Sequence, residues 1–126
     1  MNACLDSWAV LRWLEGVEPA AGRVEELLPR RPIMSWINLG EVWYVLAREV
    51  GRESAETTVG HLRHHLTLDD ATPERVLQAA AIKAVHPLAY ADAFALATAA
   101  AHEVPLLTGD PEILALSGVW PIEDIR

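Results

Sequence analysis

Residues 88–111, LAYADAFALATAAAHEVPLLTGDP, contain the most informative pattern of this sequence. Ala and Leu, with single Tyr, Phe and Thr residues, fill positions 88–101, which predicts a helix that is apolar nearly all round and therefore buried. Asp92 lies in the first turn or two of this helix, and no Lys or Arg lies within one helical turn of it. An unpaired buried carboxylate is costly. We therefore expect Asp92 to meet partners from other parts of the chain.

The rest of the sequence alternates short apolar runs with amphipathic stretches. Expected strands cover residues 2–5, 33–35, 66–68, 104–108 and 119–122. Expected helices cover residues 8–15, 19–29, 38–50, 53–66, 73–85, 88–101 and 111–116. Strands that alternate with helices throughout a chain predict an α/β fold in which helices sandwich a parallel sheet.

Composition limits the possible classes of protein. With 126 residues, 52% of them hydrophobic, the chain is expected to form a single domain, residues 1–126. Cys4 is the one cysteine, so no disulfide is expected and a reducing cytoplasm is the predicted location. We see no signal peptide and no apolar run of about 18 residues, so no membrane span is expected. The net charge of −8 argues against a protein that coats nucleic acid through a basic surface.

Four acids occupy positions where α/β proteins build their sites. Asp6 and Asp110 follow predicted buried strands, and Glu41 and Asp92 lie near the starts of predicted helices. Open α/β sheets bind their ligands beyond the carboxyl ends of the strands, so the four carboxylates are expected to converge there. Such a cluster repels itself unless a hard divalent cation neutralises it. The sequence therefore predicts a Mg²⁺ or Mn²⁺ site.

Each acid also has a purely structural explanation when it is taken alone. Asp6 fits the N-cap of the following helix, and Asp110 before Pro111 fits another. Glu41 fits the third helical position of a capping box whose cap is Asn38. Asp92, inside an apolar helix, fits such an explanation least well.

Taken together, these segments resemble the PIN-domain ribonucleases, in particular the VapC-type toxins of bacterial toxin–antitoxin pairs. The resemblance extends from Cys4 to about Ile122, and its motifs are LDSWAVL (5–11), INLGEVWYVL (37–46), LAYADAFALATAAA (88–101) and LLTGDPEIL (106–114). It implies a PIN-like three-layer α/β/α sandwich around a central, mostly parallel sheet of about five short strands.

The same resemblance implies which residues act at the site. Asp6, Glu41, Asp92 and Asp110 would bind Mg²⁺ or Mn²⁺, directly or through water, and catalyse cleavage of RNA phosphodiester bonds. Ser7 and Thr108 stand where the family places hydroxyls that orient the carboxylates. Leu96 stands where some members place a further acid, which leaves the second metal position open.

The resemblance also implies partners. The expected function is that of a metal-dependent endoribonuclease, the toxin of a type II pair, with a cognate antitoxin, an RNA substrate and a homodimeric state. Two alternatives stay open: a housekeeping PIN nuclease that processes RNA without an antitoxin, and a catalytically inactive binding module.

Aromatic and histidine residues raise further hypotheses. Trp8 and Trp36 lie near the predicted site and are candidates for stacking on unpaired bases. His61, His64 and His65 have the spacing of a metal site on one helix face, but a solvated surface cluster is the expectation.

Overall fold

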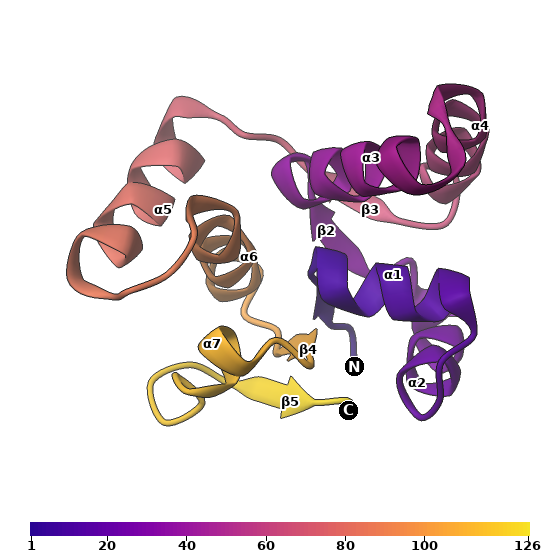
Figure 1. The fold of residues 1–126 in the computed structure, drawn as a ribbon. Helices are drawn as coiled ribbons and strands as arrows, with labels where there is room; N and C mark the ends of the chain where they lie inside the picture. Colours follow the sequence, from indigo (N-terminus) through magenta and orange to yellow (C-terminus); the bar gives the residue numbers. More distant parts are fainter.

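Short strands and longer helices alternate along the computed structural model, which describes residues 1–126 (Figure 1). The strands are β1 (Cys4–Leu5), β2 (Ile33–Ser35), β3 (Thr67–Asp69), β4 (Leu106–Thr108) and β5 (Ile122–Asp124). The helices are α1 (Ser7–Glu15), α2 (Ala20–Leu27), α3 (Trp36–Val50), α4 (Arg52–Leu62), α5 (Pro73–Val85), α6 (Tyr90–Ala101) and α7 (Pro111–Leu114), with a 3-10 turn η1 (Leu28–Arg30) after α2. No helix is both long and apolar enough to cross a membrane.

The five strands form one parallel sheet in the order β3-β2-β1-β4-β5. The chain builds outward from β1 through β2 to β3 and then returns to the other side of β1 for β4 and β5. The strand order therefore reverses between β1 and β4. In open α/β sheets, this reversal opens a crevice at the carboxyl ends of the two strands.

Alternating strand residues build a separate core on each face of the sheet. One core contains Leu5, Met34 and Leu107 together with residues of α1, α2, α3 and α4. The other contains Cys4, Ile33 and Leu106 together with residues of α6 and α7. Figure 1 shows α1 to α4 on one side of the sheet and α5, α6 and α7 on the other. The expected three-layer α/β/α sandwich with a parallel five-stranded sheet is thus confirmed.

Several expected boundaries are wrong by two residues or more. The helix expected from Asn38 begins at Trp36, because the Ser35 hydroxyl accepts the Ile37 N–H at 3.1 Å and caps it three residues earlier. Helix α4 ends at Leu62 rather than at residue 66, and the last strand begins at Ile122. That strand starts late because the amides of residues 119 and 120 bond to the carbonyl of residue 116 and prolong the turn after α7.

Candidate active site

The point where the strand order reverses holds a buried carboxylate. Leu5 is in register with Leu107, which sets the residues that follow them, Asp6 and Thr108, side by side. The Thr108 hydroxyl donates a hydrogen bond to Asp6 Oδ2, and the Ala9 N–H donates to Oδ1 at 2.9 Å. Asp6 is 2% exposed. It is therefore the N-cap of α1, as the structural explanation expected, and it also lies at the crevice between β1 and β4.

Asp110 is likewise both a cap and a neighbour of this crevice. Its Oδ1 accepts the Glu112 N–H at 2.8 Å and so caps α7. Its own N–H donates to the Thr108 hydroxyl at 3.0 Å. Because the same hydroxyl bonds to Asp6, Thr108 links the two predicted acids.

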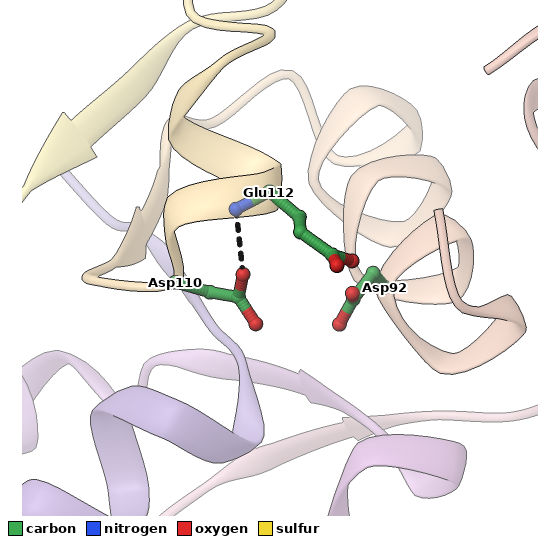
Figure 2. A group of neighbouring side chains, drawn as sticks. All are labelled: Asp92, Asp110 and Glu112. Atoms are coloured by element: carbon green, nitrogen blue, oxygen red, sulfur yellow. Dashed lines mark hydrogen bonds between the residues drawn. The ribbon is translucent and has the colours of Figure 1, made fainter. Parts of the chain in front are cut away.

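Asp110 also forms a group of three carboxylates with Asp92 and Glu112. Asp92 in the first turn of α6, Asp110 and Glu112 each offer an oxygen, and these oxygens lie within 4.8 Å of one another. Figure 2 shows the Asp110 and Glu112 side chains approaching Asp92 from the start of α7. An all-oxygen set of this size fits a hard divalent cation such as Mg²⁺ or Mn²⁺.

Glu41 is held at the side of the site by two donors. Its Oε1 accepts hydrogen bonds from the Ser7 hydroxyl at 3.0 Å and from Asn38 Nδ2 at 3.1 Å. Ser7 therefore contacts one of the predicted acids directly. Asn38 is not the helix cap that the sequence predicted, because α3 has already begun two residues earlier. Its Nδ2 also donates to the Ala91 carbonyl at 3.0 Å, next to Asp92.

None of the acids at the site is neutralised by a cationic side chain. Seven salt bridges join other residues of the protein, and none includes Asp6, Glu41, Asp92, Asp110 or Glu112. Burial, followed by the charges of Asp110, Glu41 and Glu112, raises the pKa of Asp92 to about 7. Burial is also the main cause that raises the pKa of Asp6 to about 7; its two hydrogen bonds oppose the shift, and Asp92 and Asp110 add to it. The site therefore has a need for positive charge that the chain itself does not meet.

Comparison with known families agrees with this arrangement. The sequence matches the PIN domain family over residues 3–119, nearly the whole chain. The chain belongs to the PIN domain family. No protein of curated function matches its sequence.

Solved structures share the fold of this PIN domain over their full length. A toxin–antitoxin complex from Klebsiella pneumoniae has a TM-score of 0.79 at 18% identity, with 99% of this chain and 98% of that chain covered. A DNA-bound VapBC complex from Salmonella typhimurium has a TM-score of 0.80 at 17% identity, with coverages of 100% and 99%. A Mycobacterium tuberculosis VapC toxin that cleaves the sarcin-ricin loop has a TM-score of 0.77 at 18% identity, with coverages of 94% and 96%.

Two residues at the site of this PIN domain were missed by sequence reasoning. Glu112 joins the carboxylate group because α7 starts at Pro111 and turns the second residue of the helix toward Asp92. Its signal was its place two residues after Asp110, but a Glu in a first helical turn is common at any helix start. Asn38 was noticed because it lies three residues before Glu41, but it was interpreted as the cap of the helix rather than as a hydrogen-bond donor to Glu41.

Trp8 and Trp36, the two candidates for base stacking, each contact neighbours within the PIN domain. The ring of Trp8 lies so close to Gly109 that a Cβ there would be 2.3 Å from it, so only glycine fits between Thr108 and Asp110. Arg12 stacks on the Trp8 ring at 5.0 Å, and Arg63 stacks on Trp36 at 4.9 Å. Base stacking by either tryptophan stays a prediction.

The histidine cluster lies away from the site. His61, His64 and His65 are exposed and belong to no group of side chains that converges on a metal position. The expectation of a solvated surface cluster is confirmed.

Proposed function

We propose that this PIN domain is a divalent-cation-dependent endoribonuclease and the toxin of a type II toxin–antitoxin pair. One observation carries the proposal: the carboxylates of Asp92, Asp110 and Glu112 converge within 4.8 Å, and the charges of Asp6 and Glu41 lie close enough to add to the mutual repulsion. No cationic side chain pairs with any of these five acids. Such mutual repulsion has no use in a protein that serves only as a scaffold. In a nuclease the same oxygens would bind the cation that hydrolysis of a phosphodiester requires, and the cation would relieve the repulsion.

The geometry suggests a division of tasks among the acids. Asp92, Asp110 and Glu112 would hold Mg²⁺ or Mn²⁺, since their oxygens lie within reach of one ion. When bound, the cation would lower the pKa of a water molecule and offset the charge on the phosphate oxygens. Asp6, which accepts a hydrogen bond from Thr108, would add a further negative charge next to Asp92 and Asp110. We keep Asp6 and Glu41 as further ligands, directly or through water.

Glu41 is the best candidate for a general base. Its Oε1 is occupied by two donors, so its second oxygen is the one available to accept a proton from an attacking water. No side chain needs to act as a nucleophile in this scheme.

The proposed biological role comes from the fold relatives. The Klebsiella and Salmonella structures are toxin–antitoxin complexes whose PIN-like chain this protein matches from end to end. By analogy we expect a small protein antitoxin as partner, a homodimer, and action on cellular RNA in the cytoplasm. Growth arrest on expression, relieved by co-expression of the protein encoded beside it, would support this role. Expression without any effect on growth would favour an RNA-processing nuclease.

The enzymatic proposal is tested by incubating the purified chain with labelled transfer and ribosomal RNA in Mg²⁺ or Mn²⁺. We expect cleavage that EDTA abolishes and that Asp92→Asn lacks. Asp70→Asn is the matched control, because Asp70 is exposed and makes no side-chain hydrogen bond or salt bridge. Cleavage that persists in EDTA, or in the Asp92 variant, would contradict the proposal.

A further inference from the structure

Asn38 is the most deeply buried amide side chain near the carboxylates, and it does not serve the purpose that its position in the sequence suggested. It is 0% exposed, lies within the first turn of α3 and leaves the cap of that helix to Ser35. We infer that Asn38 is a positioning residue that fixes Glu41 relative to Asp92 and so prepares the site for its divalent cation. This inference rests on the proposed function.

The contacts of Asn38 connect two helices across the site. Its Nδ2 donates to Glu41 Oε1 at 3.1 Å within α3 and to the Ala91 carbonyl at 3.0 Å in α6. Ala91 directly precedes Asp92, so one amide group bonds to the acid of α3 and to the backbone beside the acid of α6. A single side chain therefore links the acid of α3 to the backbone that carries Asp92.

Glu41 is held from a second direction as well. The Ser7 hydroxyl, from α1, donates at 3.0 Å to the same Oε1 that accepts from Asn38. Two donors on one oxygen fix the rotamer of the carboxylate and leave its other oxygen without a partner in the chain. Hydrogen-bonding partners of this kind orient metal ligands and tune their affinity.

The other end of the amide argues against a merely structural role. Asn38 Oδ1 is buried and has no hydrogen-bond partner. A buried polar atom without a partner costs stability, whereas an apolar group of the same shape does not. Leucine at position 38 would lose the two hydrogen bonds of Nδ2 but would also remove this unpaired oxygen, so stability alone gives asparagine little advantage there. The amide is explained by what its nitrogen does for Glu41 and Ala91.

Asn38→Leu tests the inference, because leucine keeps the shape of the side chain and removes both hydrogen bonds. The first readout is calorimetric titration with Mn²⁺, for which we expect the Kd to rise about 10-fold. The second is RNA cleavage in Mn²⁺, for which we expect kcat to fall about 10-fold with KM within about twofold of the wild type. The melting temperature in EDTA should fall by only a few degrees, because removal of the unpaired Oδ1 partly offsets the two lost hydrogen bonds.

Thr98→Val is the matched control. Thr98 is also buried, lies on α6 and has a hydroxyl without a partner, but it touches none of the carboxylates. This variant should bind Mn²⁺ and cleave RNA like the wild type. A loss of Mn²⁺ affinity in Thr98→Val equal to that in Asn38→Leu would overturn the inference, because any disturbed polar core position would then have the same effect.

A second variant covers the case in which Asn38→Leu does not fold. Asn38→Ser keeps a polar group but is too short to reach Glu41 and Ala91 together, so Mn²⁺ binding should again weaken. If the wild type binds Mn²⁺ and cuts RNA, and the folded Asn38 variants do both equally well, the inference is overturned while the proposed function stands. If the wild type neither binds Mn²⁺ nor cuts RNA, the proposed function fails and the inference fails with it.

Discussion

Two carboxylates at the same edge of the sheet have opposite surroundings. Asp69 ends β3 and Asp6 follows β1, two strands away. Asp69 accepts hydrogen bonds from Arg75 Nε at 2.8 Å on Oδ2 and from Arg75 Nη2 at 3.1 Å on Oδ1, and His102 Nε2 lies 2.8 Å from the same Oδ1. Asp6 has no cationic partner, and only a hydroxyl and one backbone N–H bond to it.

The two surroundings shift the two pKa values in opposite directions. Burial acts to raise the pKa of Asp69, but the hydrogen bonds and charges of Arg75 and His102 outweigh it and lower that pKa. Burial without such partners raises the pKa of Asp6 to about 7. The chain thus neutralises the acid that joins β3 to α5 and α6, and leaves unpaired the acids that face the crevice. Asp69 is thus paired within the fold, whereas the acids at the crevice are left for the cation that the proposed function assigns to them.

The largest expected difference between the two acids is in activity. Asp6→Asn keeps the N-cap of α1, because asparagine caps helices as well as aspartate does. It removes one negative charge from the site, so we expect RNA cleavage to fall by about 100-fold. The melting temperature in EDTA should stay the same or rise, because an uncompensated buried charge is gone. If the variant cuts RNA at the wild-type rate, Asp6 has a structural role like that of Asp69 and no role in cleavage.

The converse change is expected to affect stability. Asp69→Asn leaves Arg75 and His102 without their shared acceptor charge, which should lower the free energy of unfolding by about 1–3 kcal/mol. Urea unfolding measures this loss, and the rate of RNA cleavage per folded molecule should remain within about twofold of the wild type. Asp124→Asn is a suitable control, since Asp124 pairs with Arg126 at the exposed surface. Equal losses in the two variants would mean that the Asp69 network adds nothing beyond a surface pair.

The positions of Asp6, Asp110 and Asp92 could be predicted from the sequence alone. The convergence of Asp6 and Asp110 followed from the rule that parallel strands end at one edge, and the burial of Asp92 followed from the apolar helix around it. In the structure, Thr108 joins Asp6 and Asp110, and Asp92 is half-buried. The choice between helix cap and site residue does not have to be made, because Asp6 and Asp110 cap their helices and also lie at the crevice.

Other features depend on packing that no local pattern encodes. Asp69 and Asp6 each stand at the end of a short apolar run, and only the folded chain brings Arg75 and His102 to one of them. The signal for the capping box at Asn38 was misleading because Ser35, three residues earlier, is an equally good cap. Glu112 belongs to the site only because of the direction in which α7 leaves Asp110.

Glu112 offers a smaller test of the unpaired group. It is the exposed member of the three carboxylates around the cation position, so its charge is the most screened. Glu112→Gln should therefore raise the Kd for Mn²⁺ by about fivefold, which corresponds to about 1 kcal/mol. Glu53→Gln, an exposed acid in the first turn of α4, controls for the change in net charge. Identical Mn²⁺ titrations of the two variants would remove Glu112 from the site.

The smallest expected effect is a dependence of stability on pH that differs in sign between the two regions. Because the pKa of Asp92 is raised to about 7, the folded protein binds more protons than the unfolded chain between about pH 4 and pH 7. The free energy of unfolding should therefore fall as pH rises through that window, and the melting temperature in EDTA should be a few degrees lower at pH 8 than at pH 5. Asp69 acts in the other direction: its lowered pKa stabilises the fold above about pH 4, and that contribution is lost as pH falls through the lowered pKa.

Thermal unfolding of Asp92→Asn across the same pH range separates the two contributions. This variant should have a flatter profile than the wild type between pH 5 and pH 8, and both should lose stability together as pH falls below 4 toward the lowered pKa of Asp69. Saturating Mn²⁺ should flatten the wild-type profile in the same way, because the cation supplies the charge that protons otherwise supply to the unpaired carboxylates. If the wild type and Asp92→Asn lose stability in parallel from pH 5 to pH 8, the repulsion at the crevice is too weak to distinguish its acids from Asp69, and the contrast between the two regions would then rest on activity alone.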